Sequence, residues 1–371
     1  MRTYLDHNAT SPARPEVIKA VADAMVVIGN PSAPHGHGRA ARSIISKCRE
    51  SLGLAMGVCA QDIIFTSCGT EGANTAVHSA VNGGCKRLLM SALDHPASLA
   101  AADASSAAVE FIPALPSGVL DLAWLKTRLE AWDTADGRPF ISSTYANSET
   151  GVIQPVEEII DLARDHNGLV HIDAVQALGK IELTIQPDYM CVSAHKLGGP
   201  LGIGALYVAP DAPFTSFMQG GGQERRRRAG TMNVAGAAGF NAALNVAKGL
   251  SFVEMLRDAI EAGLKEMEPN VVIFGEGETR LPNTSFVAVP DAMNNTLMMN
   301  LDLHGISVST GTACSSGVVG ASRAVTAMGR SADAPKGPIR ISLGYNSTQA
   351  DVDAILTAWA KIRLKDLRGA A

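Results

Sequence analysis

Residues 189–200, which read YMCVSAHKLGGP, decide the fold. An apolar, strand-like run leads to Lys196, and a glycine-rich turn follows it. This order puts a lysine at the carboxyl end of a strand, where ligands gather in open α/β sheets. A partly desolvated lysine there can form a Schiff base with a carbonyl group. Taken alone, the same segment also fits a surface lysine in a turn.

Outward from this segment, short apolar runs alternate with helical stretches between about residue 60 and residue 208. The strand-like segments are residues 63–66, 87–92, 109–112, 140–145, 169–173, 189–193 and 204–208. A helix is predicted at 155–166, where a proline suits the first turn and apolar side chains recur at helical spacing. Strands that alternate with helices favour an α/β fold with a mostly parallel sheet covered on both faces.

The character of the sequence changes after residue 222. A basic run at 225–228 precedes a predicted helix at 234–250, and a second helical stretch reaches about residue 268. Strand-like segments return at 271–274 and 285–289. We therefore expect a large domain at residues 13–250 and a smaller one formed by residues 1–12 with 251–371.

The composition favours a soluble protein with a small-molecule substrate. Of the 371 residues, 46% are hydrophobic and 18% are charged, and the net charge is -5. This balance gives no general attraction for nucleic acid or for anionic lipid. No apolar run is long enough to span a membrane or resembles a signal peptide, so we expect a cytoplasmic location. Six scattered cysteines without metal-ligand spacing predict neither a disulfide framework nor a metal site.

Other polar side chains follow the predicted strands. Asp173 ends one strand, where a carboxylate can keep a pyridinium nitrogen protonated, and Gln176 could donate to the phenolic oxygen of the same ring. Asp173 could equally be a helix N-cap. Gly69 and Thr70 lie in a strand-to-helix turn that outlines a phosphate cradle. His95 could stack on a flat heteroaromatic ring, although a lone histidine is more often structural.

Two residues in the last third are candidates for substrate chemistry. Cys314 lies in a small, polar, glycine-containing stretch, where a thiol can be exposed and can ionise. It could also be an incidental loop cysteine. Arg340 lies in a strand-like segment, and its planar guanidinium suits the α-carboxylate of an amino acid, unless it forms an ordinary surface ion pair.

Taken together, these segments resemble the cysteine desulfurases, within the class V aminotransferase group of fold-type I pyridoxal-phosphate enzymes. The matching segments run along nearly the whole chain: residues 4–10 (YLDHNAT), 30–32 (NPS), 65–71 (FTSCGTE), 171–176 (HIDAVQ), 193–196 (SAHK), 220–224 (GGGQE), 229–231 (AGT), Cys314 and 340–344 (RISLG). The sequence departs from the family at Ser148, where many members have asparagine.

The resemblance implies a role for each candidate. Lys196 would be the Schiff-base lysine, His95 the stacking residue, Asp173 the pyridinium partner and Gln176 the phenolate partner. The phosphate would be held by Gly69, Thr70, Ser193 and His195. Thr231 would reach the cofactor phosphate of a neighbouring subunit, which implies a homodimer. Arg340 and Asn8 would bind the substrate. The fold would contain a seven-stranded, mostly parallel sheet and a smaller α+β domain that carries the cysteine loop.

The implied activity is removal of sulfur from L-cysteine, which leaves alanine and a persulfide on Cys314. The cysteine loop resembles the long-loop, nitrogen-fixation group, whose thiol hands sulfur to iron–sulfur scaffold proteins or other acceptors. Two alternatives stay open. Another class V enzyme, such as an aminotransferase or a selenocysteine lyase, would need the lysine and the aspartate but not necessarily Cys314. A non-catalytic sulfur carrier or scaffold would keep the fold without the chemistry.

Overall fold

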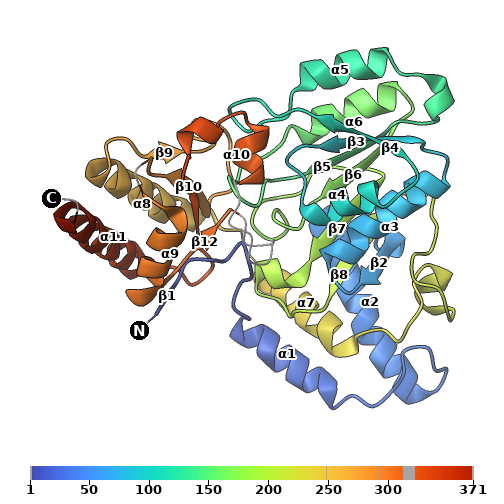
Figure 1. Ribbon diagram of the computed structural model, residues 1–371. Coiled ribbons are helices and arrows are strands. Elements are labelled where there is room, and N and C mark those ends of the chain that lie inside the picture. Colours follow the sequence, from blue (N-terminus) through green and yellow to red (C-terminus); the bar gives the residue numbers. More distant parts are fainter. Residues whose placement is uncertain (1, 248, 291, 312–321, 370–371) are drawn as a thin grey trace.

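The computed structural model describes residues 2–247, 249–290, 292–311 and 322–369 (Figure 1). Within these ranges the chain forms a large lobe around one wide sheet and a smaller lobe built mainly from the C-terminal third. Both chain ends lie on the side of the smaller lobe (Figure 1).

Seven strands form the large sheet, in the order β2-β8-β7-β6-β5-β3-β4. They are β2 (Ile63–Thr66), β3 (Arg87–Ser91), β4 (Ala108–Ile112), β5 (Phe140–Thr144), β6 (Leu169–Asp173), β7 (Tyr189–Ser193) and β8 (Gly204–Val208). Only β8 among them runs antiparallel to its neighbours. Each strand lies where an apolar run predicts one, to within a residue. The expected mostly parallel seven-stranded sheet is therefore confirmed.

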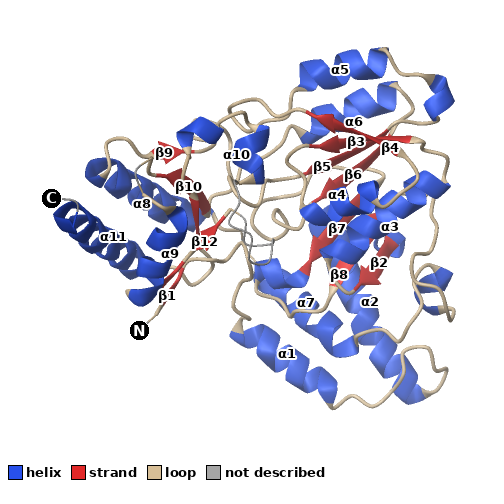
Figure 2. Ribbon diagram, viewed as in Figure 1, coloured by secondary structure: helices blue, strands red, loops and turns tan. Residues whose placement is uncertain are grey.

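Helices cover both faces of this sheet (Figure 2). One face packs against α3 (Gly69–Asn82) and α4 (Pro96–Asp103). The opposite face packs against α1 (Pro15–Met25), α2 (Gly36–Met56), α5 (Leu122–Glu130), α6 (Val156–Asp165) and α7 (Val234–Val246). Helix α7 ends four residues earlier than the sequence predicts, because Ala247 turns to an extended conformation and Gly249 adopts a positive φ of 73°. Burial on both faces explains why the strands read as continuous apolar runs.

The smaller lobe contains an antiparallel sheet in the order β12-β13-β10-β9. Its strands and helices are β9 (Val272–Ile273), β10 (Thr284–Ala288), β12 (Ser309–Thr310), β13 (Ile339–Ser342), α8 (Glu254–Met267), α9 (Asn294–Leu303), α10 (Arg323–Ala327) and α11 (Gln349–Gly369). The N-terminal strand β1 (Thr3–Tyr4) pairs with β11 (Ile306–Ser307). A buried apolar core joins Leu5 to side chains between Leu250 and Ile362. The domain limits at residues 12 and 250 stay a prediction.

Six short 3-10 helices connect these described elements: Ala60–Asp62, Thr134–Asp136, Ala194–Leu197, Gln223–Arg226, Ser251–Val253 and Ser331–Asp333. No helix in the described part of the chain is both long and apolar enough to cross a membrane. Within the same residues, no three His, Cys, Asp or Glu side chains are grouped so that they could hold a metal ion.

Candidate active site

A pocket of about 380 Å³ lies at the carboxyl edge of the large sheet, where it meets the smaller lobe. The parallel strands β2, β3, β5, β6 and β7 all point their carboxyl ends toward this edge, so the residues that follow them converge. The lining residues are Asn8, Ala9, Cys68, Gly69, Thr70, Leu93, His95, Ala97, Thr144, Ser148, Asp173, Val175, Gln176, Ser193, His195, Lys196 and Arg340.

Lys196 reaches the pocket from the short turn that follows β7. The turn ends at Gly198, whose φ of 83° suits glycine and brings the chain back on itself. The Nζ atom donates to the backbone oxygens of Asn8, at 2.7 Å, and Ala9, at 2.9 Å. The amine is therefore held at the pocket by main-chain carbonyl groups of the N-terminal segment.

Asp173 ends β6 beside Lys196. Its Oδ1 atom accepts a hydrogen bond from the amide of Val175 at 2.9 Å, so the carboxylate also fixes the turn after the strand. The thiol of Cys191, on the neighbouring strand, lies close to it. Burial, and then the Asp173 charge, raise the pKa of Cys191 well above its usual value, so this thiol stays protonated.

Gly69 and Thr70 begin α3 at the end of β2. No side chain caps the first turn, so its amide N–H groups can bind an anion. A Cβ atom on Gly69 would lie 2.7 Å from Cγ2 of Val175, so the close approach at this point requires glycine. His195 and Ser193 line the same pocket. Burial, together with the charge of Lys196, lowers the pKa of His195 to about 4, which keeps its ring neutral.

His95 follows β3 and lines the pocket, but it also has a structural task. Its Nδ1 atom accepts a hydrogen bond from the amide of Ala97 at 3.1 Å and so caps α4. The structural and functional interpretations of this histidine are therefore compatible, because capping fixes the position of the ring.

Arg340, on β13, brings the smaller lobe to the pocket. The residue is only 4% exposed, and its guanidinium donates to Oδ1 of Asp6 at 2.8 Å and to the backbone oxygen of Ser148 at 3.1 Å. This ion pair is buried rather than at the surface. The Nε atom is buried and has no hydrogen-bond partner among the described residues, and each Nη group has a second N–H beyond the bond named here.

Asn8 links the two lobes. Its side-chain nitrogen donates to the hydroxyl of Thr284 at 2.9 Å and to the backbone oxygen of Ser148 at 3.2 Å. Its side-chain oxygen accepts from Lys180 at 2.8 Å and from Asn283 at 3.1 Å. Both the nitrogen and the oxygen of this side-chain amide thus form hydrogen bonds within the protein. Direct contact of Asn8 with a substrate stays a prediction.

The comparisons with known proteins agree with this geometry. The class-V aminotransferase family matches residues 3–355. The chain belongs to this family. It is 38% identical to the cysteine desulfurase of Cereibacter sphaeroides, over 96% of this chain and 94% of the relative. It is 33% identical to cysteine desulfurase NifS of Azotobacter vinelandii, over 95% of this chain and 90% of the relative. The X-ray structure of a NifS-like protein from Rickettsia africae superimposes with a TM-score of 0.89, at 31% identity, over 98% and 99% of the two chains.

The resemblance seen in the sequence is therefore confirmed, and class V enzymes use pyridoxal phosphate as their cofactor. The residues of the pocket fit this group. The uncapped first turn of α3, with Thr70, Ser193 and the neutral ring of His195, supplies donors for a phosphate. Asp173 supplies a carboxylate for a ring nitrogen, and Lys196 supplies the amine that would hold the aldehyde carbon.

Among the predicted site residues that the structure describes, Thr231 does not line the pocket. Thr231 is exposed, on the segment between a 3-10 turn and α7. Cys314 lies outside the described residues. The described residues on either side of its segment, Gly311 and Ser322, both lie beside Glu149: Ser322 donates a hydrogen bond to this carboxylate, and a Cβ atom on Gly311 would collide with it. Glu149 directly follows Ser148 of the pocket, so Gly311 and Ser322 lie near the site.

Sequence reasoning missed three residues that shape the site. Lys180 donates hydrogen bonds to Gln176 and Asn8, Asp6 holds Arg340, and Asn283 supports the Asn8 amide. One signal was present for Lys180, which interrupts the otherwise apolar run of residues 177–181 four positions after Gln176. Asp6 and Asn283 carry no comparable signal, because their partners lie hundreds of residues away.

Proposed function

We propose that this protein is a cysteine desulfurase that uses pyridoxal phosphate to transfer sulfur from L-cysteine to Cys314, with release of L-alanine. The observation that carries the proposal is the convergence of Lys196, Asp173 and the partly unpaired guanidinium of Arg340 on one pocket. Relatives named cysteine desulfurases match nearly the whole chain, which favours this reaction over other class V chemistry.

When bound, pyridoxal phosphate supplies an electron sink for the charge left when a proton is removed from the substrate. Lys196 would hold the cofactor, and its Nζ atom would carry the α-proton of the substrate. Asp173 would keep a proton on the ring nitrogen. The nearby Cys191 thiol would not exchange that proton, because burial raises its pKa and keeps it protonated. Gln176 offers an amide N–H to the ring oxygen.

Arg340 orients the amino acid. Its Nη atoms each donate once, to Ser148 and to Asp6, which fixes the plane of the guanidinium, and its remaining N–H groups would bind the α-carboxylate of cysteine.

Cys314 then acts as the nucleophile. Its thiolate attacks the sulfur of cysteine, an S–S bond forms, and the C–S bond breaks with its electron pair left on the substrate carbon. That carbon gains a proton, for which His95 is the nearby exchanger, and alanine results. Cysteine and the enzyme thiol thus become alanine and an enzyme persulfide, with no external oxidant.

The wider setting belongs to the same proposal. The exposed position of Thr231 supports its contact with a second copy of the chain, and hence a homodimer. The match to a relative named NifS supports transfer of the persulfide sulfur to an iron–sulfur scaffold or another acceptor protein. We assign the protein to the cytoplasm, where such acceptors would be met.

The test is to load the protein with pyridoxal phosphate, add L-cysteine, and quantify alanine and sulfide under a reductant, with Cys314→Ala and Cys59→Ala as a matched pair. Cys59 is exposed, so its loss controls for a generic surface thiol. Equal alanine and sulfide in the wild type and in Cys59→Ala, and neither in Cys314→Ala, is the expected result. The buried thiols cannot substitute, because burial raises the pKa of Cys48 to about 12 and that of Cys85 to about 11.

The other outcomes identify the alternatives. Sulfide released by Cys314→Ala as fast as by the wild type would show that Cys314 is not the nucleophile. Amino-group transfer to a keto acid without sulfide would move the protein to another class V reaction. A protein that shows no visible absorption band after reconstitution with the cofactor would be a non-catalytic member of the family.

A further inference from the structure

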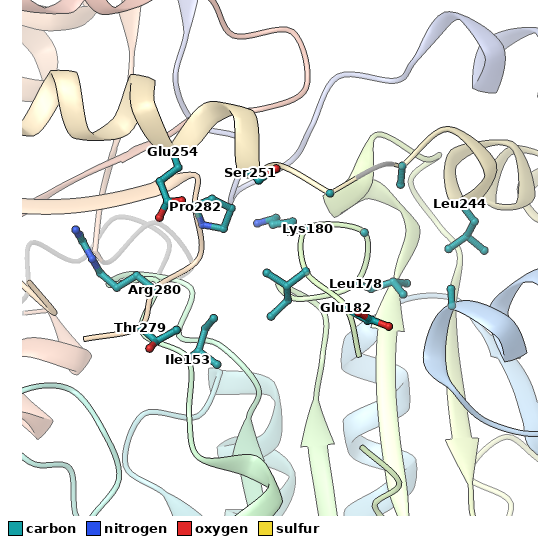
Figure 3. Close-up of a pocket in the computed structure, with 15 residues that line it drawn as sticks. Ile153, Leu178, Lys180, Glu182, Leu244, Ser251, Glu254, Thr279, Arg280 and Pro282 are labelled. Atoms are coloured by element: carbon teal, nitrogen blue, oxygen red, sulfur yellow. The ribbon is translucent and has the colours of Figure 1, made fainter. Parts of the chain in front are cut away.

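A second lysine, Lys180, lies behind Gln176 in the turn that follows β6. It is 4% exposed. On its other side the turn lines a cleft of about 650 Å³ between the two lobes. Figure 3 shows Lys180 among the residues of this cleft, with Glu254 and Arg280 on one side and Leu244 on the other. Lys180 thus separates the cleft from the active-site pocket.

The Nζ atom of Lys180 has two hydrogen-bond acceptors, and both are side-chain amide oxygens. It donates to Oε1 of Gln176 at 2.7 Å and to Oδ1 of Asn8 at 2.8 Å. Lys180 forms no ion pair with a described carboxylate. A buried lysine is normally paired with an acid, so this arrangement is unusual.

The charged groups around Lys180 do not compensate a positive charge. On the pocket side the nearby groups are Lys196 and Arg340, both cationic, and His7 lies close by. The acids that line the cleft with Lys180 are Glu182 and Glu254, and Glu254 is paired with Arg257; Arg280 is paired with Glu261. Burial, followed by the charges of Lys196 and Arg340, lowers the pKa of Lys180 well below its usual value.

A neutral amine fits this site atom by atom. It has two N–H donors, which match the two amide oxygens, whereas an ammonium would leave a third N–H without an acceptor. Both amides turn their oxygens toward this amine, because the side-chain nitrogen of Asn8 donates to Thr284 and Ser148 and that of Gln176 also has an acceptor elsewhere. The oxygen of Gln176 faces Lys180, and its nitrogen donates to the backbone oxygen of Asn8 at 3.0 Å, with one N–H left.

We infer that Lys180 is a positioning residue for cofactor chemistry: it fixes the orientation of the Gln176 amide, so that this residue presents an N–H donor and not an oxygen to the pocket. The inference rests on the proposed function only in that pyridoxal phosphate is the group that receives the donor. A flipped amide would bring its oxygen toward the phenolic oxygen of the cofactor, and two acceptors would repel each other. Lys180 prevents this from outside the pocket.

The test compares Lys180→Met, Gln176→Leu and the double variant, with Lys126→Met as the control at an exposed lysine. Each protein is loaded with pyridoxal phosphate, and its visible spectrum is titrated with pH in the absence of substrate. A donor to a negatively charged oxygen favours the deprotonated form, so losing it raises the midpoint. We expect Lys180→Met and Gln176→Leu each to raise the midpoint by about 0.5 to 1 pH unit, the effect of one hydrogen bond.

The double variant should shift no further than Gln176→Leu, and Lys126→Met should titrate as the wild type does. Lys180→Gln keeps an N–H donor at the site and should recover part of the wild-type midpoint; it also replaces Lys180→Met if that variant does not fold. An unshifted midpoint in Lys180→Met, or additive shifts in the double variant, would overturn the inference. The expected shifts in a protein that releases no sulfide would refute the desulfurase proposal and leave the role of Lys180 standing.

Discussion

The protonation state of Lys180 predicts how the stability of the protein depends on pH. In the unfolded chain this lysine titrates near its ordinary pKa of 10.5, whereas burial and the nearby cations lower the pKa in the folded protein. Between these two values the unfolded chain holds one proton more than the folded chain. The free energy of unfolding therefore rises with pH in this window, and it falls as the pH is lowered.

The size of this pH dependence follows from the one proton by which the folded and unfolded chains differ. Relative to Lys180→Met, which cannot titrate, the wild type should gain up to about 1.4 kcal/mol per pH unit within the window between the lowered pKa of Lys180 and its ordinary pKa. At the upper end the variant is the less stable protein, because the oxygen of Gln176 has lost the donor given by Lys180, which costs about 1–3 kcal/mol. At lower pH the difference in unfolding free energy between the wild type and Lys180→Met shrinks.

The assay is urea unfolding of the apoprotein at pH 7.5, 8.5 and 9.5, with Lys126→Met as the control for an exposed lysine. All groups other than Lys180 are shared by the wild type and Lys180→Met, so their titration cancels in the difference. A difference that stays constant across this range would show that Lys180 carries its proton in the folded protein as it does in the unfolded chain. That result would refute the neutral-amine argument.

Three further outcomes are expected. Gly69→Ala should weaken binding of pyridoxal phosphate about 5- to 100-fold in equilibrium titrations, because the new methyl group overlaps Val175 and displaces the start of α3. Unchanged affinity would show that this turn does not hold the cofactor. Arg340→Lys should lower kcat/KM for cysteine about 10- to 100-fold, mainly through KM, since an ammonium cannot replace the planar fork; a change in kcat alone would contradict a carboxylate-binding role. Trp359→Ala should cost about 3–5 kcal/mol in urea unfolding and leave the cofactor spectrum unchanged, because this fully buried ring lies in the core of the smaller lobe.

The large sheet could be predicted because its signals are local. Each strand is a short apolar run bounded by turn residues, and the parallel order brings the ends of these runs to one edge. Lys196, Asp173 and His95 were predicted to share a pocket for this reason, and they do. The expected end of α7 was wrong by four residues, since a helical pattern does not show where tertiary contacts stop it.

The support of the site could not be predicted, because it depends on contacts between distant parts of the chain. The amine of Lys180 is buried against side-chain amides of residues 8 and 176, and nothing in the surrounding sequence indicates that no acid will lie near it. The pairing of Asp6 with Arg340 likewise joins the first and last tenths of the chain. Such pairs appear only when both lobes are in place.

The position of Asn8 has a consequence for the synthesis of the protein. The backbone amide of Asn8 donates to the hydroxyl of Ser342, and its side chain contacts Thr284. Asn8 is therefore synthesised long before these two partners. The sheet of the large lobe uses only residues 63–208 and can form earlier. Lys196, which is held by the backbone of residues 8 and 9, acquires its final surroundings only after residues 284 and 342 have been made. Capture of the cofactor in its native geometry would therefore come late in folding, and a ribosome-stalled chain that stops before Arg340 and Ser342 should not achieve it.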